Sequence, residues 1–189
     1  ISEADEDLAA ALREAALDTV EGAFGYAGGE ELDKPGLGVR RRTRLELTDR
    51  AGRTQRLYLK RYGPEPPAKR FARFIRGRCA SPAEMELRNI RAVDRAGVPT
   101  MSPVAEGHEG GCFGAGRSFL VVTEVPGEAL ERCAEAHLSH GGDAAGARLA
   151  GALGELAAAL HSAGLVHRDF YASHIFLEEV DAAPRLWLI

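Results

Sequence analysis

The stretch of sequence that decides the fold runs from Leu165 to Leu177 and reads LVHRDFYASHIFL. It follows a segment with leucines at helical spacing, so residues 144–163 are predicted to form an amphipathic helix. It leads into two short apolar runs, residues 174–177 and 185–189, which are typical of strands joined by a loop over 178–184. The polar residues of the stretch are therefore predicted to lie on a loop. The leucines that predict the helix are Leu149, Leu153, Leu156 and Leu160.

The His-Arg-Asp triplet at residues 167–169 suits phosphoryl transfer. In kinase-fold enzymes a loop of this form carries a carboxylate that orients the attacking hydroxyl, and a second side chain that holds a divalent cation. Asp169 and His174 have the required spacing of five residues. A His-Arg-Asp triplet alone is weak evidence, but its position between a helix and paired strands makes it informative.

Residues 43–48 and 55–60 alternate between polar and apolar side chains, and residues 49–52 between them are typical of a turn. This pattern predicts an antiparallel hairpin. Lys60 ends its second strand, where an inward-pointing lysine would suit the α and β phosphates of a nucleotide. An ordinary surface lysine would be the preferred interpretation if Lys60 stood alone.

The sequence SPAE at residues 81–84 combines an N-cap serine, a proline and a capping glutamate, and predicts a helix over 82–96. Glu86 lies on the apolar side of this helix, next to Ile90. A carboxylate directed at the core needs a cationic partner, and Lys60 is the obvious candidate. The alternative is that Glu86 lies at the edge of the apolar stripe and is solvated.

Three segments together resemble the bacterial lipopolysaccharide core kinases, which phosphorylate heptose or Kdo sugars of the lipid-linked core. The resemblance covers about residues 40–189, and it implies a protein-kinase-like bilobal fold. His174 stands where protein kinases have asparagine, as it does in the lipopolysaccharide kinases. The segments are YLKRY at 58–62, GVPT at 97–100 with PVA at 103–105, and HRDFY at 167–171 with HIFL at 174–177.

The resemblance implies a chemical role for four side chains. Asp169 would orient or deprotonate the acceptor hydroxyl, and His174 would bind magnesium. Lys60 would bind phosphate, with Glu86 as its partner. ATP and Mg2+ are the implied cofactors, and a lipid-linked core oligosaccharide is the implied acceptor. We expect the four side chains to converge on one nucleotide triphosphate.

The resemblance also implies contacts from two backbone segments. Backbone groups of Glu124 and Val125 would contact the adenine ring, and Pro126-Gly127 would form the hinge between lobes. Gly36 and Gly38 stand where a glycine-rich loop should cover the nucleotide. They match that pattern only partly, and a plain loop explains them equally well.

The run Leu186–Ile189 reads as the strand after which these kinases carry a second metal-binding aspartate. The sequence stops one position before that aspartate, and most of the helical lobe that would hold the acceptor is missing. We therefore expect the sequence to be a piece of a longer protein. A stop codon after Ile189 would instead favour a non-catalytic module that binds nucleotide or a partner.

Charge is distributed in three blocks. Residues 1–33 carry ten acids and one base, residues 34–78 fifteen bases and three acids, and residues 79–189 eight bases and fifteen acids. The basic stretch Lys60–Arg78 is predicted either to be a solvated face or to meet an anionic partner, such as a phosphorylated sugar or an anionic membrane surface. The aromatic content of 6% and the lack of a base-reading motif argue against a nucleic-acid partner.

Sequence features also indicate the cellular compartment of the protein. No apolar run reaches the roughly 18 residues of a membrane span, and the acidic N-terminus does not resemble a signal peptide. Three scattered cysteines argue against a disulfide framework and a zinc site. We expect a cytoplasmic protein, peripheral at the inner face of the cytoplasmic membrane. The cysteines are Cys79, Cys112 and Cys133.

These patterns predict an α+β protein of protein-kinase-like bilobal fold, with an N-lobe of antiparallel sheet and one helix, and a truncated helical C-lobe. The predicted domains are an acidic leader over 1–33, an N-lobe over 34–126 and the start of the C-lobe over 127–189. The leader is expected to be a solvated extension, with one helix over 4–20 and a loop over 22–38.

The predicted function is ATP-dependent phosphorylation of a sugar hydroxyl of the lipopolysaccharide core. Two alternatives stay open: a kinase-like protein acting on protein or small-molecule hydroxyls, and a non-catalytic module that binds nucleotide or a partner.

Overall fold

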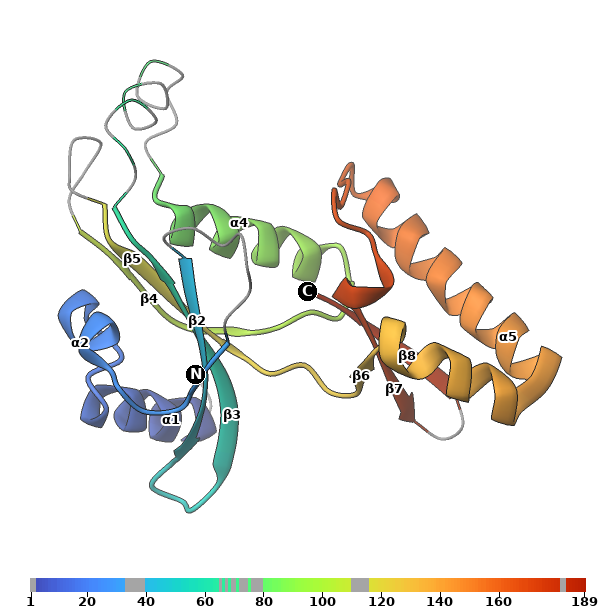
Figure 1. Cartoon of the computed structure of the whole chain (residues 1–189), viewed down its shortest axis with the longest axis horizontal. Coiled ribbons are helices and arrows are strands. Elements are labelled where there is room, and N and C mark those ends of the chain that lie inside the picture. Colours follow the sequence, from blue (N-terminus) through green and yellow to red (C-terminus); the bar gives the residue numbers. More distant parts are fainter. Residues whose placement is uncertain are drawn as a thin grey trace. The chain divides into compact units, whose positions relative to one another are not determined.

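The computed structural model describes residues 3–32, 40–64, 66, 68, 71, 75, 80–109, 116–180 and 183–189 (Figure 1). The chain forms two compact units, one of Ile1–Arg88 with Ser102–Glu124 and the other of Asn89–Met101 with Val125–Ile189. Each unit has a sheet and a hydrophobic core of its own.

The first unit is built on a five-stranded antiparallel sheet with the strand order β1-β2-β3-β5-β4. The predicted hairpin is confirmed as β2 and β3, and both strands are longer than expected. The short strand β1 was not predicted. The strands are β1 (Glu30–Glu31), β2 (Arg40–Thr48), β3 (Thr54–Tyr62), β4 (Pro103–His108) and β5 (Ser118–Thr123).

The acidic N-terminal segment is part of the core of the first unit, so the expectation of a solvated extension is wrong. Its helices α1 (Glu3–Glu14) and α2 (Val20–Gly25) pack their apolar sides on one face of the sheet (Figure 1). The apolar side of α1 is visible in the sequence as the helical spacing of Leu8 and Leu12, but its packing against the sheet was not predicted. The core cluster contains Leu8, Leu12, Leu17, Val20, Ala23, Leu45, Leu57, Leu59, Phe119 and Val121.

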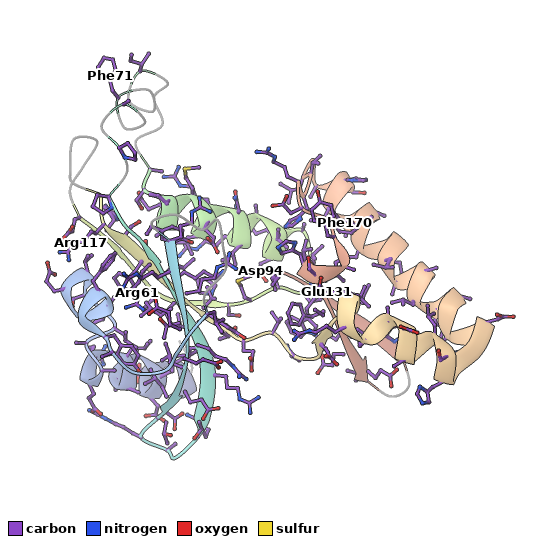
Figure 2. All side chains as sticks on the ribbon, viewed as in Figure 1. Arg61, Phe71, Asp94, Arg117, Glu131 and Phe170 are labelled. Carbon is purple, nitrogen blue, oxygen red and sulfur yellow. The ribbon has the colours of Figure 1, made fainter. Side chains whose placement is uncertain are left out.

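Arg61 on β3 is buried on the same face of the sheet as Leu59 (Figure 2). Its guanidinium donates hydrogen bonds to the Thr43 hydroxyl and, at 3.3 Å, to the Tyr26 carbonyl. These bonds tie the residue after α2 to the sheet. Because Arg61 is buried, it does not contribute to an exposed basic surface, contrary to the expectation for Lys60–Arg78.

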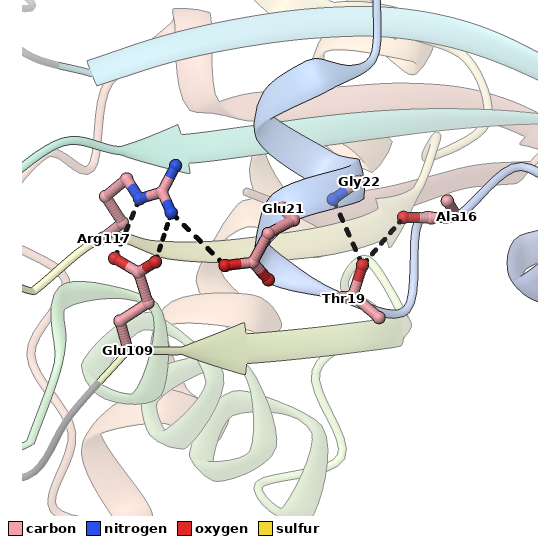
Figure 3. A network of polar contacts seen from close by, with 6 residues as sticks. All are labelled: Ala16, Thr19, Glu21, Gly22, Glu109 and Arg117. Carbon is pink, nitrogen blue, oxygen red and sulfur yellow. Dashed lines mark hydrogen bonds and ion pairs between the residues drawn. The ribbon is translucent and has the colours of Figure 1, made fainter.

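Two short helices replace the single helix predicted over residues 4–20. Between them Ala16 has a φ of 53°, which interrupts the helical backbone. Thr19 then caps α2, because its hydroxyl accepts a hydrogen bond of 3.1 Å from the Gly22 amide (Figure 3). The predicted loop over 22–38 is therefore wrong at its start, where α2 continues to Gly25.

Acidic side chains of α1 and α2 pair with arginines of the sheet region. Arg117 contacts Glu109, at 2.8 Å from its Nε, and Glu21 of α2, at 3.5 Å from its Nη2 (Figure 3). The Glu21–Arg117 pair is partly exposed, so it contributes at most about 1 kcal/mol. Apolar burial therefore accounts for most of the attachment. Two further pairs join α1 to the β2–β3 turn: Glu14–Arg50 at 2.7 Å and Asp7–Arg53 at 3.2 Å.

Replacing Leu17 by alanine is expected to lower the free energy of unfolding by about 3 kcal/mol, because its side chain is fully buried in this core. Urea denaturation followed by circular dichroism measures the change. The matched control is Leu138→Ala on an exposed position, expected to cost less than about 0.5 kcal/mol. Equally small effects of the two variants would contradict the burial of the N-terminal segment.

The helix α4 (Pro82–Arg95) confirms the predicted capping box. The Ser81 amide donates to the Glu84 carboxylate at 2.6 Å, and the Glu84 amide donates to the Ser81 hydroxyl at 3.2 Å. Gly97, with a φ of 75°, follows the end of the helix as predicted. The capping box fixes where the helix starts, and it thereby places Glu86 in the second turn.

The second unit combines a three-stranded antiparallel sheet, in the order β6-β7-β8, with the long helix α5 (Leu130–Ser162). The predicted helix over 144–163 is the second part of α5, and the part before the kink at Gly142 was not predicted. The predicted loop over 178–184 is too long, because β7 continues to Val180. The strands are β6 (Glu128–Ala129), β7 (Ile175–Val180) and β8 (Ala183–Leu188).

The core of the second unit lies between α5 and its sheet. Three of the four leucines that predicted the helix are buried in it, and the fourth, Leu153, packs against it and is partly buried. Across the parts of the chain that the structure describes, no helix has the length and apolar character needed to cross a bilayer. The buried members of the core are Val98, Leu130, Leu149, Leu156, Leu160, Ile175, Leu177, Leu186 and Leu188.

Candidate active site

The predicted pair of Lys60 and Glu86 is confirmed. Lys60 on β3 places its Nζ atom 2.5 Å from Oε1 of Glu86 on α4. The Lys60 side chain is 12% exposed and that of Glu86 is 31% exposed, so the interpretation of Glu86 as a solvated edge residue is wrong. The hairpin and the capped helix thus hold two charges from distant parts of the sequence against each other.

The surroundings of Glu86 favour its ionised form. Burial opposes ionisation of Glu86, but the charge of Lys60 and hydrogen bonds from Lys60 and Tyr62 outweigh it and lower the pKa of Glu86. The carboxylate is therefore ionised at neutral pH. An ionised, anchored carboxylate restricts the position of the lysine ammonium.

The face of the sheet that carries Lys60 is rich in cations. Arg42 on β2 lies directly opposite Lys60, Arg40 lies opposite Tyr62, and Arg44 lies opposite Tyr58. Residues directly opposite in an antiparallel pair point to the same face of the sheet. The period-two spacing of these arginines was visible in the sequence, and it indicates a face that favours anionic groups.

Glu124, predicted to contact adenine through its backbone, is the centre of a side-chain network. Its carboxylate accepts a hydrogen bond of 2.9 Å from the Tyr58 hydroxyl and lies 3.2 Å from Nε of Arg44. Its amide donates to the Arg56 carbonyl at 2.9 Å. The Glu124 amide therefore already has a hydrogen-bond acceptor within the sheet, and it is not free to contact the adenine ring as predicted. The backbone contacts of Val125 stay a prediction.

The loop that carries Asp169 belongs to the second unit and follows α5 directly. The Tyr171 amide donates to the Asp169 carbonyl at 2.8 Å, and the His174 amide donates to the Tyr171 carbonyl at 2.9 Å. The short 3-10 helix η1 (Ala172–His174) continues into β7. These bonds hold the backbone between Asp169 and His174 in a tight turn, while the Asp169 side chain is exposed.

Two histidines of this loop each have one ring nitrogen without a hydrogen-bond partner. Nδ1 of His167 and Nδ1 of His174 are buried without a hydrogen-bond partner, and the ring centroids lie 6.2 Å apart. The Phe170 ring packs edge-on against His167, with the two ring centroids 6.4 Å apart. Ile189 donates its amide to the His174 carbonyl at 2.9 Å, so the end of β8 lies beside the loop.

The structure describes only part of the predicted site. No group of three or more potential metal ligands occurs among the described residues, so the magnesium role of His174 stays a prediction. Gly36 and Gly38 lie outside the described residues. The same holds for the basic residues Lys69, Arg70, Arg73, Arg76 and Arg78, and for Cys79 and Cys112.

Comparison with known proteins shows the family of the chain. The sequence model of the Lipopolysaccharide kinase (Kdo/WaaP) family matches residues 38–189. The chain belongs to this family. A solved structure described as WaaP in complex with acyl carrier protein is similar, with a TM-score of 0.68 and 26% identity over 94% of this chain. This chain covers 66% of the WaaP chain, and no curated protein matches it.

Membership in the lipopolysaccharide kinase family confirms the resemblance drawn from the sequence. The fold is mixed α/β with antiparallel sheets and is similar to that of WaaP. Sequence reasoning missed one residue of the Lys60 site, Tyr62, whose hydroxyl donates a hydrogen bond to Glu86. The signal was present, because Tyr62 stands two residues after Lys60 and so shares its face of β3.

Proposed function

We propose that the protein is an ATP-dependent phosphotransferase that phosphorylates a heptose or Kdo hydroxyl of the lipopolysaccharide core. The observation that carries the proposal is the Lys60–Glu86 pair in a member of the lipopolysaccharide kinase family. In kinase-fold enzymes such a pair positions the lysine for the nucleotide phosphates. The proposal includes a bilobal, kinase-like arrangement in which both units act on one nucleotide.

Each residue has a defined task in the proposed reaction. The sugar hydroxyl oxygen attacks the γ-phosphorus, the bond to the β–γ bridging oxygen breaks, and ADP leaves. Asp169 accepts the hydrogen bond, and then the proton, of the attacking hydroxyl. Lys60 neutralises charge on the α and β phosphates, and Glu86 keeps its ammonium in place. Positioning and charge neutralisation supply most of the rate enhancement.

The residues present fit ATP with Mg2+, provided that phosphate and water oxygens supply most of the ligands of the ion. Mg2+ prefers oxygen ligands and is often held by substrate phosphates, waters and one or two carboxylates. Asp169 is assigned to the acceptor hydroxyl, so the protein's contact with the ion would come from His174, whose Nδ1 has no hydrogen-bond partner. Because an imidazole is a weak ligand for Mg2+, most ligands would be phosphate and water oxygens. The bound ion would neutralise phosphate charge.

Transfer of labelled phosphate tests the proposed function. The full-length protein is incubated with γ-labelled ATP, Mg2+ and dephosphorylated core oligosaccharide, and NMR locates the phosphate on the product. Label on a core sugar supports the proposal. Label only on protein or small-molecule hydroxyls would instead support a kinase-like protein that acts on those hydroxyls. Nucleotide binding without any transfer would support a non-catalytic module.

A membrane-bound acceptor gives the basic stretch Lys60–Arg78 a proposed role. Reversing three of its charges, with Arg70, Arg73 and Arg76 replaced by glutamate, is expected to weaken binding to anionic phosphatidylglycerol vesicles about a hundredfold or more, because each basic residue near such a surface contributes about 1 kcal/mol. Sedimentation with vesicles measures binding.

The matched control reverses three exposed arginines elsewhere, Arg91, Arg95 and Arg148. Neutral phosphatidylcholine vesicles provide the baseline. Equal binding by the two triple variants would reject the basic stretch as the membrane-binding surface.

A further inference from the structure

Tyr62 gives the Lys60–Glu86 pair a third member. It is the last residue of β3, points to the same face as Lys60, and is only 5% exposed. Its hydroxyl donates a hydrogen bond to Oε2 of Glu86, while Lys60 contacts Oε1. Each oxygen of the carboxylate thus has its own donor, and both donors come from one strand.

The phenol of Tyr62 is suited to act only as a donor. Burial, together with the nearby charge of Glu86, raises the pKa of Tyr62 far above its ordinary value, so the hydroxyl stays protonated. The guanidinium of Arg40 lies over the ring, 5.7 Å from its centroid. The ring is therefore held by contacts on two sides, from Arg40 and Glu86.

A lysine alone would fix the glutamate poorly. The ammonium is a point charge on a flexible stem, so one contact leaves the carboxylate free to rotate and leaves its second oxygen without a donor. A partly buried carboxylate oxygen without a donor is unfavourable. The rigid phenol of Tyr62 meets this need, and it fixes the plane of the carboxylate that Lys60 contacts.

We propose that Tyr62 is a positioning residue for phosphoryl transfer, which holds Glu86 so that Lys60 is presented to the nucleotide phosphates. This inference rests on the proposed function, because it assigns Lys60 to phosphate binding. In this role Tyr62 acts through Glu86, to which its hydroxyl donates a hydrogen bond.

Replacing Tyr62 by phenylalanine removes only the hydroxyl and is expected to lower kcat/KM for ATP about tenfold, the effect of losing a hydrogen bond to a charged group. The acidic limb of the pH profile should move to higher pH, because Glu86 loses a donor that lowers its pKa. The matched control is Tyr26→Phe, a phenol deletion in the same unit that should leave both quantities unchanged. A Tyr62→Phe variant equal to an active wild type would overturn the inference.

A double-mutant cycle separates positioning from general packing. In a Glu86→Gln background, Tyr62→Phe should cause little further loss of kcat/KM, because the carboxylate through which it acts is absent. The same tenfold loss in both backgrounds would overturn the inference, since it would show that Tyr62 acts independently of Glu86.

A carboxylate titration distinguishes failure of this inference from failure of the proposed function. Carbon-13 NMR of labelled glutamate follows Glu86 in the wild type and in Tyr62→Phe. A higher pKa of Glu86 in the variant is expected whether or not phosphate is transferred. An unchanged pKa overturns the role of Tyr62, whereas a wild type that neither binds nor turns over ATP overturns the proposed function.

Discussion

Replacing Asp169 by asparagine is expected to reduce kcat for phosphoryl transfer about a thousandfold or more, while the affinity for ATP stays within a few-fold. General-base and orienting groups contribute about 10²–10⁴-fold to such reactions. Asparagine matches the shape of aspartate but cannot accept a proton. Because Asp169 is assigned to the acceptor hydroxyl rather than to the nucleotide phosphates, nucleotide binding should be largely preserved.

Rapid-quench kinetics and calorimetric ATP binding measure the two quantities separately. Asp143→Asn is the matched control, an exposed aspartate on α5 of the same unit, and it should behave as wild type. Thermal unfolding should be the same for both variants, because the Asp169 side chain is exposed. Near-normal turnover by D169N would remove Asp169 from its assigned role.

Local rules predicted the elements that frame the site. Alternation of side chains predicted β2 and β3, and the capping box predicted the start of α4. The Lys60–Glu86 pair followed from one anomaly, a carboxylate on an apolar helix side. A buried charge is informative because a partner of opposite charge must offset the cost of burying it.

Non-local contacts account for the errors. The N-terminal segment was expected to be solvated because its composition is acidic, yet its acids pair with Arg50, Arg53 and Arg117, far away in the sequence. The apolar stripe of α1 was visible as helical spacing, but spacing alone does not show which surface the stripe packs against. Tyr62 was missed for a related reason, since an aromatic residue at a strand end is ordinarily read as core.

Loss of the Lys60 charge is expected to affect both activity and stability. Replacing Lys60 by methionine is expected to lower kcat/KM for ATP about a hundredfold to a thousandfold, because a charge that stabilises the phosphates is lost. It should also lower the free energy of unfolding by roughly 1–3 kcal/mol at neutral pH, since Glu86 then keeps its charge without its cationic partner. Glu86 is only 31% exposed, so water compensates incompletely.

The pH dependence of the stability loss follows from the pKa of Glu86. In the wild type this pKa is lowered on folding, so the pair contributes stability above the unfolded pKa, and this contribution is lost as the pH falls through the folded pKa. The stability difference between wild type and Lys60→Met should therefore be largest near neutral pH and shrink in acid. Urea titrations at several pH values measure it.

Adding Glu86→Gln to Lys60→Met separates the loss of stability from the loss of ATP turnover. The double variant has no unpaired carboxylate, so it should recover most of the lost stability, while ATP turnover stays low because the lysine is still absent. Recovery of turnover together with stability would show that Lys60 acts only through folding. A Lys60→Met variant with full stability at neutral pH would show that Glu86 does not depend on the lysine for its charge.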